Sequence, residues 1–388
     1  MKKLYPFLAL LLLKTASFAQ PNKIIVQSNI RLQKDSIVKN QFMNSLNGFI
    51  AAKDSIVSKN HFVLPANRLA TAALLEEMKE VNKSEKYNND FFYKPYLTNL
   101  VKLSDSTYLT QLSYIGVSDS IPELRASFTF IAEKAGDQFY FSSPLRYNTK
   151  GWKVFIMGNI TFHYKDTINV LNATNYSKLI SQFDKKLNAP DRPTEYYCCD
   201  NFHDALFITG VEYKSDYNGY RVNSLMAEEN NTWLNVNGLF TPDFSNVDPH
   251  DLWHSRLHRV VPFSTINKPV DEGTAYLNGG SWGLTWQEIL TRFKQYASAH
   301  PDADWVSLYN ESTNFDEKGK YPLNVDMVIN ALIVQKIEKE KGIKPVLELV
   351  SCGKKQKDNE NYFKALEQIS GMKKADFTKD VNQLISEN

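Results

Sequence analysis

The spacing of apolar residues changes from helical to strand-like within the first 150 positions. Residues 66–83 repeat apolar side chains at intervals of three and four, which predicts an amphipathic helix. Alternating runs rich in aromatic and β-branched side chains follow, and they predict strands over residues 107–117, 126–132 and 138–142. Gly136-Asp137 separates the last two runs and predicts a hairpin turn. We therefore expect a small α+β domain over residues 20–150, with a helix packed on a sheet.

The second half of the chain begins with strand patterns and ends with helical ones. Strands are expected over residues 152–164, 195–199 and 232–239, with an amphipathic helix over 173–187. From residue 248 onward the pattern is helical, most clearly over residues 286–299, 325–341 and 362–369. This order favours an α+β fold over a doubly wound sheet, in which strands and helices alternate. Pro144 and the polar stretch 148–151 mark a boundary, so the second domain is expected over residues 151–388.

The first 19 residues have the three parts of a secretory signal peptide. Two lysines follow Met1, an apolar run extends over residues 4–13, and Ser17-Phe18-Ala19 provides a small-x-small cleavage site. About ten apolar residues are too few to span a bilayer, and no later stretch approaches the ~20 that a membrane helix needs. We expect an exported protein, periplasmic or secreted, that is cleaved after Ala19 and has no membrane span.

The charge balance and the cysteine content exclude two further classes of protein. Cleavage after residue 19 would leave 42 of the 45 basic residues against 43 acidic ones, so a nucleic-acid partner has no electrostatic support. Three cysteines are too few for a disulfide framework, although one bridge could form in an oxidising compartment. The adjacent Cys198 and Cys199 are interpreted as small strand residues rather than as a redox pair.

The segment D-P-H-D-L-W-H-S-R-L-H, residues 248–258, is the sharpest chemical feature of the sequence. Pro249 suits the first position of a helix, and Asp248 before it can cap the helix N-terminus. His250 and His254 are then four residues apart, so that both rings lie on one face and can reach one ion. The chain has seven histidines, and a pair on a helix surface is the plainer alternative.

A carboxylate downstream completes a possible set of metal ligands. Glu272 follows His254 by 18 positions, within V-D-E-G-T-A-Y. Two imidazoles and one carboxylate supply three protein ligands and leave the fourth tetrahedral position for water. This layout is typical of a catalytic Zn²⁺ site rather than a structural one.

In these features the chain resembles the gluzincin metallopeptidases, in particular the bacterial peptidase MA-like group. The similarity covers residues 152–388. It rests on the two-histidine helix, on the spacing to Glu272 in an E-G-x-A context, and on the strand expected over residues 232–239. The resemblance implies a zincin-like domain in which His250, His254 and Glu272 bind zinc. It further implies an exported peptidase that uses metal-bound water and grips a peptide or protein substrate along an edge strand.

One position departs from the pattern of the family. The residue after the first histidine is glutamate in H-E-x-x-H, where it serves as the general base, and this chain has Asp251 there. The aspartate side chain is one methylene shorter, so its oxygens retreat by about 1.5 Å if the helix is unchanged. A misplacement of about 1 Å can cost on the order of 100-fold in rate. Asp251 is therefore the predicted catalytic base, in a site that could be weakened or remodelled.

Three alternatives remain at this stage. His258 could replace Glu272 as the third ligand, although it lies about 80° around the helix from His250. The chain could be a catalytically impaired, peptidase-like binding protein that keeps the scaffold, with or without the metal. The pair His250-Asp251 could instead belong to a metal-dependent phosphohydrolase, which would need further ligands on several helices.

Overall fold

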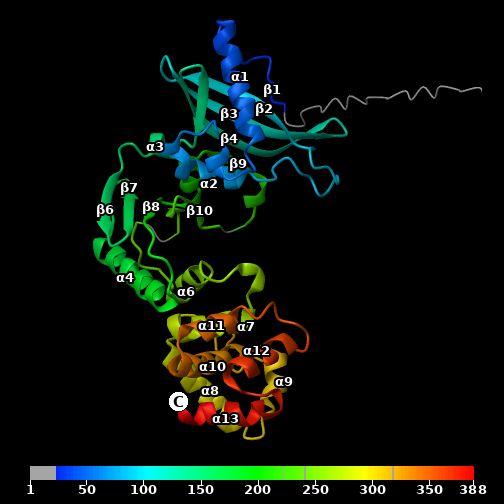
Figure 1. Ribbon diagram of the computed structural model, residues 1–388, viewed down its shortest axis with the longest axis vertical. Coiled ribbons are helices and arrows are strands. Elements are labelled where there is room, and N and C mark those ends of the chain that lie inside the picture. The colour runs from blue at the N-terminus through cyan, green and yellow to red at the C-terminus, as the bar shows by residue number, and fades with distance from the viewer. Residues whose placement is uncertain (1–22, 221, 240–241, 317–318) are drawn as a thin grey trace, which may run out of the picture. The chain divides into compact units, whose positions relative to one another are not determined.

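The computed structural model describes residues 23–220, 222–239, 242–316 and 319–388. The predicted signal peptide, residues 1–19, lies outside the described residues. The fold is α+β, as the sequence predicts (Figure 1). The chain forms two compact units. Of the described residues, one unit takes in 23–154, 163–166 and 194–239, and the other takes in 155–162, 167–193 and those from 242 to 388.

A six-stranded sheet is the centre of the first unit. Its strands are β1 (Ile25–Val26), β2 (Lys94–Lys102), β3 (Thr107–Ser118), β4 (Ile121–Ala135), β5 (Gln138–Ser142) and β9 (Val211–Lys214). They have the order β1-β2-β3-β4-β5, with β9 also paired to β4. The predicted hairpin is confirmed, because β4 and β5 pair antiparallel from Ala135 and Gln138, and Gly136 has a φ of 62°.

Helix α1 (Ser36–Ala51) covers this sheet with aromatic side chains. Phe42 packs edge-on against Phe139, with ring centroids 5.2 Å apart, and Phe49 packs in the same way against Phe130. All four rings are buried. Burial of such rings contributes the largest single terms to a hydrophobic core. The helix predicted over residues 66–83 forms as α2 (Arg68–Met78).

The second sheet is mixed and has five strands. Its order is β10-β11-β8-β7-β6, with β6 (Lys153–Met157), β7 (Ile160–Tyr164), β8 (Thr194–Cys198), β10 (Ser224–Glu229) and β11 (Thr232–Asn237). Strands β8, β10 and β11 belong to the first unit with helices α2, α3 (Leu145–Asn148) and α5 (Phe202–Thr209), and the division between the two units falls within β6 and β7. Cys198 and Cys199 are buried and unbridged at the end of β8, and burial raises the pKa of both thiols well above the usual range.

Three sequence-based expectations differ from the structure. The single strand expected over residues 152–164 is two strands, because the chain turns at Gly158, whose φ is 58°. The strand expected over 232–239 is not an edge strand, because β11 pairs with β10 on one side and with β8 on the other. The boundary expected at 150 lies near the first division of the chain, but residues 194–239 group with the first unit. Parallel pairing of β8 with β11 ties these residues together.

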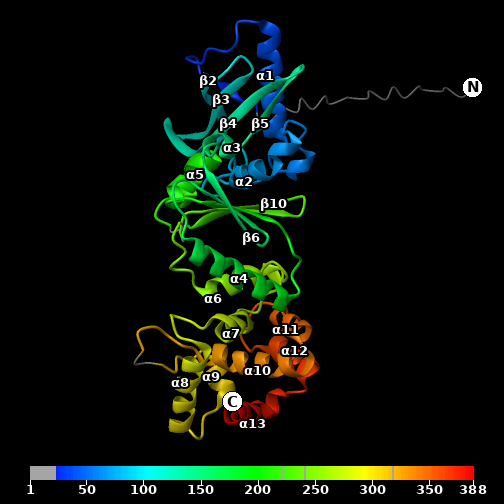
Figure 2. The ribbon, with the colours of Figure 1, turned by 90° about the vertical axis from the view of Figure 1, so that its left-hand side faces the viewer.

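The second unit is mainly helical (Figure 2). Its helices are α4 (Val170–Leu187), α6 (Pro249–Leu257), α7 (Lys268–Gly279), α8 (Trp286–Ala299), α9 (Trp305–Asn310), α10 (Val325–Lys341), α11 (Ile343–Val350), α12 (Glu360–Ser370) and α13 (Phe377–Glu387). Helix α10 is buried along most of its length and packs closely on α7. Among the described residues, no helix combines the length and the apolar character needed to cross a membrane.

Candidate metal centre

Helix α6 begins as the sequence predicts. The carboxylate of Asp248 accepts a hydrogen bond from the backbone N–H of His250 at 2.9 Å, and Pro249 occupies the first helical turn. His250 and His254 follow one turn apart, and both side chains are mostly buried. Their Nε2 atoms lie 3.1 Å apart, so both rings turn toward one point.

Helix α7 supplies the carboxylate, and two glycines allow it to approach its neighbours. A Cβ atom on Gly279 would lie 2.4 Å from the backbone nitrogen of His250, so α6 and α7 are in backbone contact. A Cβ on Gly273 would lie 2.6 Å from the Cβ of Asn330 on α10. These close contacts explain the glycine after Glu272 in the E-G-x-A segment, because a larger residue would push α7 off α10.

The three predicted ligands converge. Oε2 of Glu272 lies 3.3 Å from Nε2 of His250 and 3.7 Å from Nε2 of His254, and the two Nε2 atoms close the triangle at 3.1 Å. Zinc bonds of ~2.0–2.1 Å at tetrahedral angles would set ligand atoms about 3.3 Å apart. All three sides of the triangle are close to this length. These donor atoms therefore fit a small divalent cation.

Hydrogen bonds on the far side of each ring determine which nitrogen faces the centre. Nδ1 of His250 lies 2.6 Å from the carbonyl oxygen of Gly280, and Nδ1 of His254 lies 2.8 Å from Oδ1 of Asp271. A carbonyl oxygen and a carboxylate can only accept, so both Nδ1 atoms carry the proton. In the neutral rings each Nε2 then presents a lone pair. Two lone pairs and a carboxylate oxygen meet at one point, an arrangement that only a proton or a metal cation can stabilise.

The pKa shifts of the three side chains agree with this interpretation. Burial on its own would lower the pKa of His254, but hydrogen bonds to Asp271 and Glu272 outweigh it and raise the pKa to about 9. Burial likewise opposes a rise at His250, yet contacts with Glu272 and the Gly280 carbonyl raise its pKa. Burial alone would raise the pKa of Glu272, and the two histidines instead hold it well below its usual range. The cluster attracts positive charge.

Asp271 was not identified from the sequence, and it connects two parts of the site. Its side chain is buried, with Oδ1 bound to His254 and Oδ2 lying 3.0 Å from Nε2 of His258. Burial opposes ionisation of Asp271, but its hydrogen bonds to the two histidines keep its pKa below the usual value. His258 thus contacts Asp271. The residue that forms the ligand triangle with His250 and His254 is Glu272, and not His258. A second convergence, of His254, His258 and Asp271, shares one histidine with the first.

The predicted base, Asp251, lies on the exposed surface of α6. At 100° per residue it stands about 60° around the helix from His254 and 100° from His250. Within the part of the chain that the structure describes, it belongs to neither metal-binding cluster. Its carboxylate is therefore not part of the ligand triangle.

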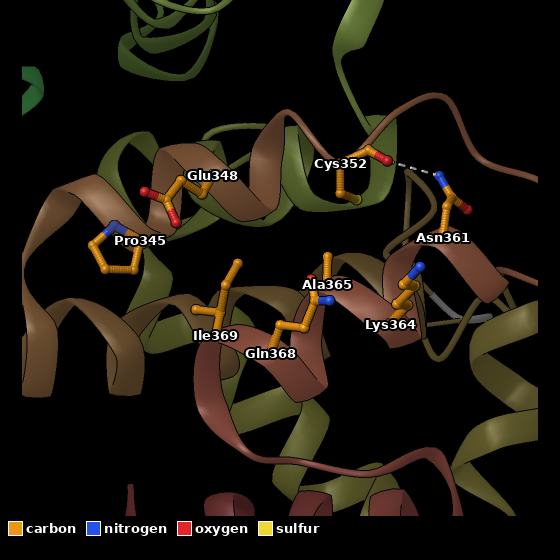
Figure 3. A pocket seen from close by; sticks show the side chains of 8 residues that line it. All are labelled: Pro345, Glu348, Cys352, Asn361, Lys364, Ala365, Gln368 and Ile369. Carbon is orange, nitrogen blue, oxygen red and sulfur yellow. Dashed lines mark hydrogen bonds between the residues drawn. The ribbon is translucent and has the colours of Figure 1, made fainter.

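A separate cavity in the same unit lies between α11 and α12 (Figure 3). It has a volume of about 570 Å³ and is lined by Pro345, Glu348, Cys352, Asn361, Lys364, Ala365, Gln368 and Ile369. Burial raises the pKa of the Cys352 thiol to about 11, so the thiol is not activated as a nucleophile at neutral pH. The cavity lacks the convergent donors of the histidine cluster.

Comparison with known proteins adds no family to these observations. No protein-family model matches the chain, and a search of curated proteins finds no match.

Proposed function

We propose that this chain is an exported zinc-dependent peptidase whose metal is held by His250, His254 and Glu272. The observation that carries the proposal is the ligand triangle with its outer hydrogen bonds. Gly280 and Asp271 fix the Nδ1 protons, and both Nε2 lone pairs therefore turn toward Glu272. Three protein ligands leave one tetrahedral position open, which distinguishes catalytic from structural zinc sites.

Each residue has a defined task in this proposal. A zinc ion bound here would supply Lewis acidity, which polarises a carbonyl and makes water a nucleophile near neutral pH. Asp251 would accept the proton from that water and pass it to the leaving amine. Asp271 holds the ring of His254 in its tautomer and raises the basicity of that imidazole. Gly280 does the same for His250 through its carbonyl oxygen.

Peptide hydrolysis is the reaction favoured by the resemblance to gluzincins. An H-D-x-x-H helix followed by an E-G-x-A helix matches the order and the spacing of that family. The glycine contacts give the spacing a physical basis, since they bring α7 against both α6 and α10. Substrate binding along residues 232–239 is not part of the proposal, because both edges of β11 are already paired.

The test has a metal arm and an activity arm. Purified mature protein should contain about one zinc per chain, and His254→Ala should abolish it, whereas His300→Ala, at an exposed histidine of the same unit, should not. The zinc-loaded protein should cleave members of a broad peptide library, and Asp251→Ala should remove cleavage while keeping the metal. Protein that takes up no zinc would refute the proposed ligands. Cleavage at the wild-type rate by Asp251→Ala would refute the proposed base.

A second function is favoured by one observation, the exposed and shortened carboxylate at Asp251. A protein with an intact metal triangle and an ineffective base would bind peptides without cleaving them. Asp251→Glu separates the two cases, because a glutamate restores about 1.5 Å of reach. Activity that arises only in this variant would identify the natural protein as a peptidase-like binding protein.

A further inference from the structure

An exposed pair of aromatic rings stands in the helical unit. Trp282 is 55% exposed and Tyr321 is 40% exposed. Their ring planes are 15° from parallel, with centroids 4.5 Å apart. The ammonium of Lys320 lies 5.0 Å from the Tyr321 centroid. Trp282 is thus the more exposed ring of the pair, and Tyr321 contacts both Trp282 and Lys320.

The pair is joined to the metal centre by short covalent and hydrogen-bonded paths. Gly280, whose carbonyl oxygen accepts from His250, precedes Trp282 by two residues, so their Cα atoms are at most about 7.6 Å apart. Burial raises the pKa of Tyr276 to about 12, and the neighbouring Ser281 and the backbone of Asn324 oppose this rise, so both loops lie beside Tyr276. The ring of Tyr276 lies 5.9 Å from that of His250.

Trp282 occupies a backbone position that its own side chain disfavours. Ser281 and Leu284 exchange both backbone hydrogen bonds, at 3.0 and 2.9 Å, so Trp282-Gly283 is a two-residue turn. Their φ values are 54° and 78°, as in a type I′ turn, where the first position strongly favours asparagine, aspartate or glycine. A bulky residue at positive φ is strained. Strain retained at an exposed aromatic residue beside a metal site points to a role in binding.

We infer that Trp282 and Tyr321 form a side-chain subsite that receives an aromatic or proline residue of a peptide next to the bond presented to the metal. A flat, apolar side chain would extend the stack on the outer face of Trp282, where ring contacts add to the burial of apolar surface. The platform that the bound side chain would meet is one indole face, which matches the size of one flat side chain. The position relative to the scissile bond rests on the proposed function, whereas ring binding itself requires no metal.

Binding of dye-labelled pentapeptide pools tests this subsite independently of cleavage. The pools are fixed as Phe, Pro or Ala at one position and varied elsewhere, and their affinities are measured with zinc-loaded and zinc-free protein carrying Asp251→Ala. Phe and Pro pools should bind about tenfold more tightly than the Ala pool. Trp282→Ala and Tyr321→Ala should abolish that preference, Trp282→Phe should keep part of it, and Tyr220→Ala, at a 76% exposed tyrosine, should leave it unchanged.

Two further comparisons make the outcome decisive. Trp282→Gly relieves the backbone strain and should raise the thermal stability, yet it should abolish the preference, which separates the ring from any effect on folding. Equal binding of all pools, or a preference that survives Trp282→Ala, would overturn the subsite. Trp282-dependent binding of a chitin oligosaccharide without peptide preference would also overturn it. A preference in protein that takes up no zinc would support the subsite and refute the proposed peptidase.

Discussion

Replacement of Asp271 tests whether the outer hydrogen bonds prepare the ligands for a metal. Asp271→Asn is isosteric, and its amide can still accept from Nδ1 of His254 and donate to Nε2 of His258, so it removes the charge alone. Asp271→Ala removes the charge and both bonds, at 2.8 and 3.0 Å. Loss of such an outer partner costs about 10–100-fold in metal affinity. We expect about tenfold weaker zinc binding for asparagine and about 100-fold for alanine, or roughly 1.4 and 2.7 kcal/mol.

The assay is competition for zinc against a chromophoric chelator, with Asp302→Asn as the control at an exposed acid of the same unit. Nitrogen chemical shifts of the His254 ring provide a readout that a general loss of stability would not change. In the wild type they should report a protonated Nδ1, and in Asp271→Ala a mixture of tautomers. Wild-type affinity in both variants would show that the buried carboxylate does not act on the metal centre.

Three other variants test the packing, the ion pair and the base. Gly279→Ala should weaken zinc binding and cost about 1–3 kcal/mol in unfolding free energy, because its Cβ would meet the backbone of His250. The control is Gly151→Ala, whose Cβ would meet nothing within 4 Å. Equal effects of the two variants in denaturant titrations would contradict the argument. Asp184→Ala should destabilise the protein by about 3 kcal/mol, because the guanidinium of Arg256, whose side chain is 8% exposed, loses its hydrogen bonds of 2.5 and 2.6 Å to the Asp184 carboxylate. An unchanged denaturation midpoint would contradict this prediction. Asp251→Glu should keep the zinc content of the wild type and match or exceed its peptidase rate, whereas a rate below that of the wild type would indicate a pocket remodelled around aspartate.

The local elements of the fold could be predicted because their signals lie within the elements. Helices α8 and α10 form over the expected residues. Helix α8 has a complete apolar stripe, and α10 contains a run of buried residues. The hairpin of β4 and β5 follows from its Gly136-Asp137 turn. The grouping of residues 194–239 with the first unit depends on parallel pairing between β8 and β11, which are separated by more than thirty residues. Periodicity within a strand does not specify a distant partner, so the grouping of these residues with the first unit was not predicted.

The candidate site could be predicted in its ligands but not in its support. Four-residue spacing places His250 and His254 on one face, and the structure brings Glu272 to both. The acceptor for His250 is the carbonyl of Gly280, a group that every residue carries, so no sequence pattern marks it. The sequence shows that Asp271 is an acidic residue next to Glu272. Only the packing of α6 on α7 shows that its carboxylate contacts two histidines.

X-ray absorption at the zinc edge of the loaded protein tests the central claim most directly, because it reports the ligands and not only the amount of metal. The proposed ligands predict a four-coordinate ion with two imidazole nitrogens and oxygen ligands, all at about 2.0–2.2 Å, and His250→Ala should remove the imidazole signal together with most of the zinc. Sulfur at about 2.3 Å, a six-coordinate shell of oxygens, or a spectrum unchanged by His250→Ala would show that the metal binds elsewhere.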